Sequence, residues 1–113
     1  MIFAEDLSFL RKKKFDYSKR MNRVIPLNVV PRGRFDRDLR RMERRGKDLS
    51  RLDDIIEELA YRRSLLPRHQ DHILVGNWKG HRECHIEPDW LLIYQIDGND
   101  LVLKRTGTHS DLF

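Results

Sequence analysis

Long apolar runs and paired cysteines are both missing from this chain of 113 residues. No run reaches the length of a membrane span, and the start lacks an apolar signal-peptide segment, so we expect neither membrane insertion nor secretion. Cys84 is the only cysteine, which excludes a disulfide framework and favours a reducing cytoplasm. We expect it to be a packed thiol on the inner face of a strand. The length fits one small domain with a modest core.

Charge is unevenly distributed along the chain, whose formal net charge is +5. Residues 1–45 hold 14 Lys and Arg against 6 Asp and Glu, whereas residues 46–113 hold 9 against 12. A basic half on a small domain is typical of proteins that bind a polyanion, most often nucleic acid. A solvated helix face with a basic tail would show the same charges. Charge alone therefore leaves both interpretations open.

Residues 1–20 differ from the rest of the chain. Phe3, Leu7 and Leu10 recur at helical spacing before a basic run, but nothing later in the sequence pairs with them. Met21 follows directly and is a candidate initiator. We therefore expect a domain over residues 21–113 that is preceded by a dispensable extension. A basic arm that binds nucleic acid or a partner is the alternative.

Hydrophobic periodicity predicts the element order β-α-α-β-β-β. A first short strand, around residues 24–30, is interrupted by Pro26, which suits the edge of a sheet. Two helices follow as a hairpin, one over 34–45 and ended by Gly46, the other capped by Asp48. Three strands complete the domain, over 78–86, 91–97 and 101–107, with a hairpin turn at 97–100. The prediction is an α+β domain with an antiparallel-rich sheet and the helix hairpin packed on one face.

The stretch 78–90 is rich in polar and aromatic side chains, with two His, two Trp, one Arg, the only Cys and three carboxylates. A run built only to fill a core would hold more Val, Ile and Leu. In a strand, alternation places these residues on two faces, with Lys79, His81, Glu83 and His85 on one and Trp78, Arg82, Cys84 and Ile86 on the other. Pro88 ends the strand, so Asp89 is expected at a corner close to His85.

The H-x-x-C-H pattern formed by His81, Cys84 and His85 looks like a zinc motif. Strand geometry disfavours it, because four residues at ~3.3 Å each put the two histidines ~13 Å apart. Zinc holds its nitrogen ligands at ~2.0–2.1 Å. We therefore expect no metal site.

Acid–base chemistry has different requirements. Histidine can give or take a proton near neutral pH because its ordinary pKa is ~6.5. Cleavage of RNA through its own 2′-hydroxyl needs a base at that hydroxyl, an acid at the leaving 5′-oxygen and positive charge on the phosphate. Residue types for all three are present at His72, His85, Asp89, His109, Arg82 and Arg105. Taken singly, each of them is more often a satisfied polar residue than a catalyst.

From Gly76 to Phe113 the chain resembles the YafQ branch of the RelE/ParE toxin superfamily. The matching segments are GNWKGHRECHIEPDWLLIY and LKRTGTHSDLF, with the upstream pair Asp71-His72, and a weaker likeness extends back to about residue 23. The resemblance implies a RelE-like fold and the toxin of a type II toxin–antitoxin pair. Such a toxin is a ribosome-dependent endoribonuclease that cuts mRNA in the A site. The resemblance implies that the enzyme uses no metal or cofactor. It also implies a cognate antitoxin that is encoded in the same operon.

The resemblance also implies site residues, and their roles follow from chemistry. His72, His85, Asp89 and His109 match catalytic positions, and on chemical grounds we expect His85 or Asp89 to be the base and His109 the acid. His72 and Arg82 would stabilise charge on the phosphate. The residues expected to contact RNA are Arg82, Trp90, Arg105, Phe113, Arg37 and Arg41. No role is expected for His69, which lies outside the matching segments.

Two other functions remain compatible with the sequence. One is a ParE-like inhibitor of DNA gyrase on the same fold, which would need no acid–base set. The other is a non-catalytic RNA-binding module, which would keep the basic helix but would not need His85, Asp89 and His109 together.

The extension generates the first prediction. If Met21 initiates the native protein, a variant that lacks residues 1–20 should keep the toxicity and the thermal stability of the full chain. Growth arrest on induction and the melting temperature check this, and a clear loss of either one in the truncated protein would refute it.

Overall fold

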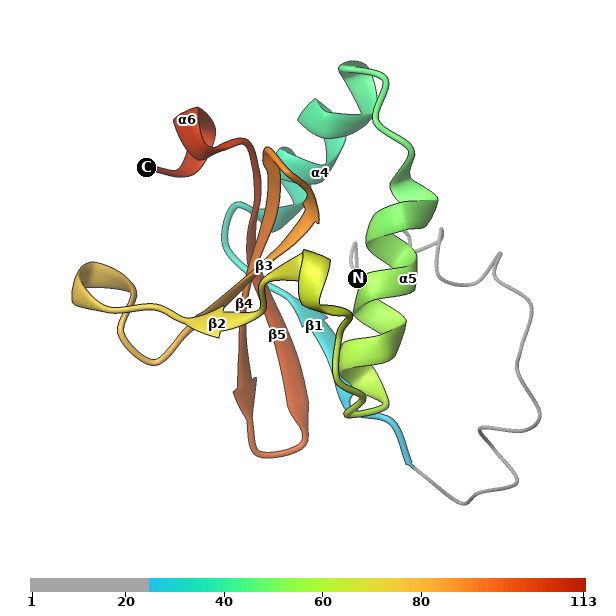
Figure 1. Ribbon diagram of the computed structural model, residues 1–113, viewed down its shortest axis with the longest axis vertical. Coiled ribbons are helices and arrows are strands. Elements are labelled where there is room, and N and C mark those ends of the chain that lie inside the picture. The colour runs from blue at the N-terminus through green and yellow to red at the C-terminus, as the bar shows by residue number, and fades with distance from the viewer. Residues whose placement is uncertain (1–24) are drawn as a thin grey trace.

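The computed structural model describes residues 25–113, so the expectations for the extension 1–20 and for Val24 lie outside it. The elements, labelled in Figure 1, are β1 Asn28–Pro31, α4 Phe35–Arg44, α5 Leu49–Ala60, the short 3₁₀ helix η1 Pro67–His69, β2 His72–Ile73, the 3₁₀ helix η2 Gly76–Trp78, β3 Arg82–Glu87, β4 Trp90–Asp97, β5 Asp100–Gly107 and α6 His109–Leu112. No helix within the described residues has the length and apolarity needed to cross a membrane.

Local sequence sets the ends of the two main helices. Gly46, just beyond α4, has a φ of +84°, the left-handed conformation that commonly ends a helix. Asp48 caps α5, and its carboxylate accepts a hydrogen bond of 3.0 Å from the backbone N–H of Ser50. The predicted helix hairpin is confirmed.

The five strands form one sheet in the order β1-β5-β4-β3-β2. β1 lies at the edge, as Pro26 predicted, and runs parallel to β5, whereas the other neighbours are antiparallel. The tight turn after β4 contains Gly98, whose φ of +60° suits the first central position of a hairpin turn. In the resulting register Leu91 lies opposite Gly107. The start of β4 and the end of β5 are thus side by side.

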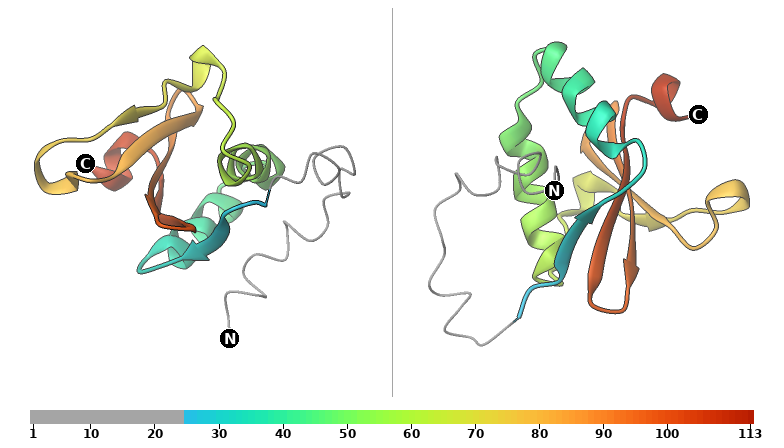
Figure 2. Two further views of the ribbon diagram at one scale, coloured as in Figure 1. Left: turned by 90° about the horizontal axis from the view of Figure 1, so that it is seen from below. Right: turned by 180° about the vertical axis from the view of Figure 1, so that it is seen from behind.

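The sheet has a helix-covered inner face and a sparsely covered outer face. In Figure 2, α5 lies on one side of the sheet and α6 on the other. The inner core combines apolar residues of α4 and α5 with Cys84, Ile86, Leu92, Tyr94, Leu101 and Leu103 of the sheet. The outer cluster is small and consists of Leu91, Ile93 and Leu112, with Leu74 and Trp78 packed against it. Much of the outer face therefore remains available for polar side chains.

The first central strand is shorter than predicted. Gly76–Trp78 forms a 3₁₀ helix and Gly80 has a φ of +89°, so regular pairing begins only at Arg82. Trp78 consequently packs on the outer face instead of sharing the inner face with Cys84. The short strand β2 and the helix α6 were also not predicted, because β2 forms only by pairing with β3 and α6 has only four residues.

Cys84 and Trp90 are fully buried. Burial raises the pKa of the Cys84 thiol, and the expectation of a packed thiol is confirmed. The Trp90 indole N–H donates to the hydroxyl of Thr106 over 2.9 Å inside the core. The expected contact between RNA and Trp90 is therefore wrong, because the side chain of Trp90 is fully buried.

A buried carboxylate ties α4 to β5. Asp38 is only 2% exposed, and it accepts hydrogen bonds from Arg105 Nε at 2.6 Å, Arg105 Nη2 at 3.2 Å and the backbone N–H of Thr106 at 3.1 Å. Arg41 adds a fourth bond of 3.0 Å from within α4. The Asp38 carboxylate thereby accepts hydrogen bonds from two arginines and from one strand N–H group.

We expect Asp38→Ala to lower the free energy of unfolding by ~3–5 kcal/mol, the usual cost of leaving the partner of a buried ion pair uncompensated. Denaturant unfolding measures it. Glu43→Ala, an exposed carboxylate on the same helix, is the control and should change stability by less than ~0.5 kcal/mol. Equal stability of the two variants would contradict the role of Asp38.

Candidate active site

The predicted acid–base residues gather on the outer face, where β3 ends and β4 begins. Alternation along β3 directs Glu83 and His85 away from Cys84, which faces the helices. The imidazole rings of His85 and His109 lie edge to face with centroids 5.7 Å apart. Residues from three elements of the sequence are thus brought to one edge of the sheet.

Asp89 and His109 form a dyad. Asp89 Oδ1 accepts from the backbone N–H of His109 at 2.9 Å and contacts His109 Nδ1 at 2.6 Å. Both bonds lower the pKa of Asp89, and the bond from the backbone N–H has the larger effect. An ionised carboxylate only accepts hydrogen bonds, so the proton of this contact resides on Nδ1. The Nε2 atom of His109 is then left for proton transfer on the exposed side.

Glu83 links the other two histidines. Its Oε1 atom lies 3.6 Å from His72 Nε2 and 3.6 Å from His85 Nε2, and the residue is only 5% exposed. His72 is fixed from its other side, where Nδ1 is 2.6 Å from the carbonyl oxygen of Gln70. No role was expected for Glu83, although strand alternation predicts it on the same face as His85.

His69 supports the backbone of the site. Its Nδ1 atom donates to the carbonyl oxygen of His85 over 2.6 Å, at a point where β2 no longer pairs with β3. The expectation that His69 has no role did not foresee this contact, because it joins a loop to a strand edge. His69 therefore cannot serve as a neutral control for the other histidines.

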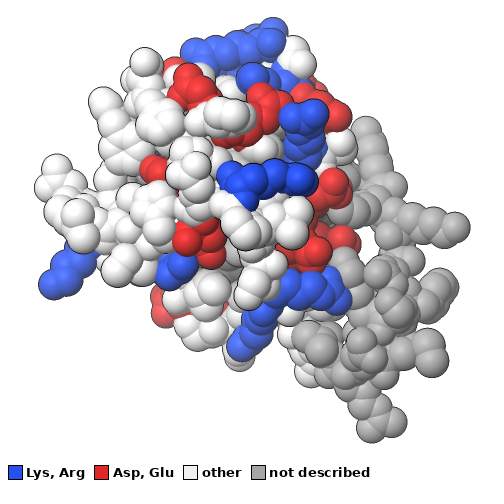
Figure 3. All heavy atoms as spheres, viewed as in Figure 1, with Lys and Arg blue, Asp and Glu red and all other residues white. Residues whose placement is uncertain are grey.

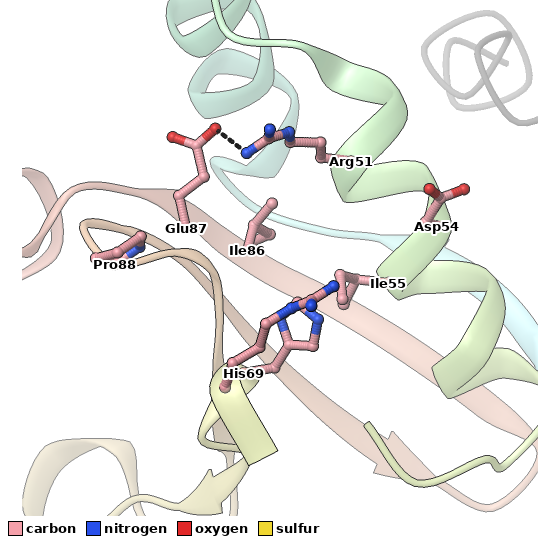
Figure 4. Close-up of a pocket in the computed structure, with 8 residues that line it drawn as sticks. Arg51, Asp54, Ile55, His69, Ile86, Glu87 and Pro88 are labelled. Atoms are coloured by element: carbon pink, nitrogen blue, oxygen red, sulfur yellow. Dashed lines mark hydrogen bonds and ion pairs between the residues drawn. The ribbon is translucent and has the colours of Figure 1, made fainter. Parts of the chain in front are cut away.

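A cavity of about 510 Å³ lies behind His69, between α5 and the end of β3. Figure 4 shows Arg51, Ile55 and Glu87 around this cavity, which is also lined by His69 of η1. Arg51 Nη1 donates to Glu87 over 2.9 Å across its rim. The cavity is thus separated from the outer face by the backbone of β3.

The two arginines expected at the phosphate are held by carboxylates. Arg82 Nε lies 3.3 Å from Asp71 Oδ1 and 3.3 Å from the hydroxyl of Tyr94, on the side of the inner core. Arg105 is bound by Asp38, as described above. Among the described residues, neither Arg82 nor Arg105 forms a hydrogen bond or ion pair with these histidines.

The remaining predicted RNA contacts are spread over the molecule. Phe113 is 62% exposed at the end of the chain, directly after α6. Arg37 is exposed on α4, whereas Arg41 is half-buried and bonded to Asp38. Within residues 25–113, no three His, Cys, Asp or Glu side chains are arranged to hold a metal ion.

The arrangement can supply two proton-transfer groups to one small molecule or phosphate. His85 and the Nε2 atom of His109 are on neighbouring rings, of which His109 is the more exposed. Such a pair meets the geometric requirement for a general base and a general acid that act on one reacting centre.

Comparison with known proteins identifies close relatives. Residues 27–113 match a family described as the bacterial toxin YafQ of type II toxin–antitoxin systems. The chain is 40% identical over 91 residues to the mRNA interferase toxin YafQ of Escherichia coli K12, covering 80% of this chain and 99% of that protein. A metal-bound toxin from Helicobacter pylori is 43% identical with a TM-score of 0.73, covering 77% of this chain and 99% of that one. The toxin–antitoxin complex of DinJ and YafQ from E. coli contains a chain that is 37% identical with a TM-score of 0.72, covering 79% of this chain and 99% of that one.

The dyad geometry gives a prediction about the Asp89 carboxyl. In His109→Ala the imidazole bond is lost, but the stronger contribution, the backbone N–H at position 109, is retained. We expect the pKa of Asp89 to rise relative to the wild type and to stay below its ordinary value of ~3.9. A titration followed by ¹³C NMR of the carboxyl carbon measures this shift. An unchanged pKa would show that the imidazole does not contact Asp89 in solution.

Proposed function

This chain belongs to the YafQ family of bacterial type II toxins, and we propose that it is an mRNA interferase that cuts mRNA on translating ribosomes. The name of the E. coli relative supports endoribonuclease activity. The observation that carries the proposal is the Asp89–His109 dyad with the ring of His85 beside it. Neither a gyrase inhibitor nor a passive RNA-binding module would need a carboxylate-fixed imidazole next to a second histidine.

In the proposed reaction the imidazole of His85 removes the proton of the 2′-hydroxyl. The 2′-oxygen attacks the adjacent phosphorus, the bond from phosphorus to the 5′-oxygen breaks, and His109 Nε2 gives its proton to that leaving oxygen. The products are a 2′,3′-cyclic phosphate and a 5′-hydroxyl. No metal is needed, because the two histidines supply both proton transfers.

Asp89 acts on His109 in this scheme. Sequence alone left the base open between His85 and Asp89. Asp89 Oδ1 is engaged with both N–H groups of His109, which favours His85 as the base. The carboxylate fixes the tautomer and the orientation of the His109 imidazole, as the aspartate of a catalytic triad does for its histidine.

Phosphate charge requires a cation near the two rings. With Arg82 and Arg105 paired to carboxylates, His72 is the remaining candidate on the outer face. It is half-exposed, and its Nε2 atom lies 3.6 Å from Glu83 Oε1. Phe113 is exposed and can stack on a base, since every base has a π face.

Ribosome binding is assigned to α4. Arg37 and Arg44 are exposed and lie on one face of the helix, because two turns separate them. Figure 3 shows Lys and Arg side chains over the end of the molecule where α4 meets α5. Reversal of both charges should weaken co-sedimentation with ribosomes in a salt-dependent way, and unchanged co-sedimentation would exclude this surface.

A cognate antitoxin is the second proposed partner. The support is the family itself and the E. coli complex of DinJ with YafQ. Co-expression of the gene next to this one should restore growth through a stable complex of the two proteins. Growth arrest that persists despite a soluble neighbour protein would point to an antitoxin encoded elsewhere.

Single substitutions test the chemistry. We expect His109→Ala and His85→Ala to reduce the cleavage rate on translating ribosomes by ~10²–10⁴, the usual loss when a general acid or base is removed. Asp89→Asn keeps an oxygen that can accept from Nδ1, so it should retain more activity than Asp89→Ala. If Asp89 were the base, the two variants would be equally inactive.

His81→Ala is the matched control. The imidazole of His81 packs on Trp78 and lies 3.4 Å from the carbonyl oxygen of Lys79, and its removal should leave the rate unchanged. Cleavage by His109→Ala at the rate of the wild type would show that the acid is a different group.

A further inference from the structure

The catalytic imidazole of His109 sits on a very short element. His109 opens α6, which has only four residues, and isolated helices below ~12–15 residues are marginal in water. Contacts with the rest of the molecule must therefore set its position. One of them is apolar, since Leu112 is 8% exposed and packs against Leu91 and Ile93.

The second contact is an ion pair that reaches across to α4. Arg45, the residue after α4, donates to Asp111 through Nη1 at 2.6 Å and through Nη2 at 3.1 Å. The Asp111 side chain is 12% exposed and that of Arg45 is 42% exposed. The hydrogen bond from Arg45 is the largest of the effects that lower the pKa of Asp111. Two parallel bonds of this kind fix direction as well as distance.

Asp111 also organises the start of α6. Its carboxylate accepts from the backbone N–H of Thr108 at 2.9 Å, and its own N–H donates to the Thr108 hydroxyl at 3.2 Å, which completes a capping box. The chain passes so close that a Cβ atom on Gly107 would lie 2.9 Å from Asp111 Oδ2. The glycine before Thr108 is therefore required by the carboxylate of Asp111.

The dyad itself lacks such support. The side chains of His109 and Asp89 are 54% and 65% exposed, so burial does not hold them together. Their contact requires α6 to be correctly placed at the end of β5. We propose that the ion pair of Arg45 and Asp111 is a positioning element, which fixes α6 and thereby holds His109 Nδ1 on Asp89. The catalytic consequence of this ion pair rests on the proposed function, whereas its effect on the contact between His109 and Asp89 does not.

Two single variants test the proposal, Asp111→Asn and Arg45→Gln. Both should reduce the cleavage rate at saturating ribosome concentration by ~10-fold or more, because displacement of a catalytic group by 1 Å can cost ~10² in rate. The double variant should be no worse than either single one. Arg45→Lys keeps the charge but not the paired geometry, and should recover part of the rate. Asp97→Asn, an exposed aspartate on the β4–β5 turn, is the control with the same change of charge.

These variants separate positioning from RNA binding. Asp111→Asn makes the protein more positive, so a weaker electrostatic attraction to the ribosome cannot explain a loss of rate. If Arg45→Gln is impaired while Asp111→Asn cleaves at the rate of the wild type, Arg45 acts on RNA and the proposal is overturned. All rates are compared below the unfolding temperature of each variant.

A measurement without RNA tests the same proposal directly. In ¹⁵N-labelled wild type, the Nδ1–H proton of His109 should give a resonance protected from exchange by Asp89. We expect Asp111→Asn and Arg45→Gln to abolish that resonance, and Asp97→Asn to keep it. Its persistence in both variants would overturn the proposal even if their cleavage is impaired. If the wild type cuts no mRNA at all, the proposed function fails, and the NMR result still decides whether the ion pair positions His109.

Discussion

The antiparallel register of β4 and β5 is the constraint on which both the core and the candidate site depend. The pairing of Leu91 with Gly107 sets the start of β4 beside the end of β5. Asp89 directly precedes β4, and His109 lies two residues after the end of β5. A slip by one residue would exchange the faces of each strand, so Trp90 and Leu92 would leave the core. The packing of the inner face thereby protects the geometry of a site on the outer face.

Carboxylates organise the cations and imidazoles of this protein. Asp38 holds Arg105, Asp111 holds Arg45, and Asp89 holds His109. The first two pairs connect α4 to the strand and the helix that end the chain. The third leaves a single imidazole nitrogen for proton transfer. Among the basic residues of the first half of the chain, Arg41 and Arg45 are thus held by carboxylates.

Most of the fold could be predicted from short-range signals. Gly46, Asp48, Pro88 and the turn at residues 97–100 mark element ends through local backbone chemistry, and hydrophobic periodicity gives the faces. The hairpin turn sets the start of β4 beside the end of β5, and Asp89 and His109 flank these two points. Sequence could predict this part because each signal lies within a few residues of the feature that it determines.

The missed features depend on partners distant in sequence. Arg105 and Asp38 are 67 positions apart, and no local pattern shows that this arginine is already bound. Arg82 likewise meets Asp71 only after β3 has formed. Glu83 was on the predicted face, but its place between two histidines required β2, which has only two residues. Long-range pairing decides which charged side chains remain free, and periodicity does not report it.

The central claim is that two histidines cut RNA through its own 2′-hydroxyl. It is tested most directly with an mRNA on translating ribosomes that carries one 2′-deoxynucleotide at the cleavage position, in parallel with the all-ribose mRNA. The account predicts cleavage of the all-ribose mRNA alone, with a 2′,3′-cyclic phosphate and a 5′-hydroxyl at the new ends. Cleavage of the deoxy-substituted mRNA, or ends that carry a 3′-hydroxyl and a 5′-phosphate, would contradict it.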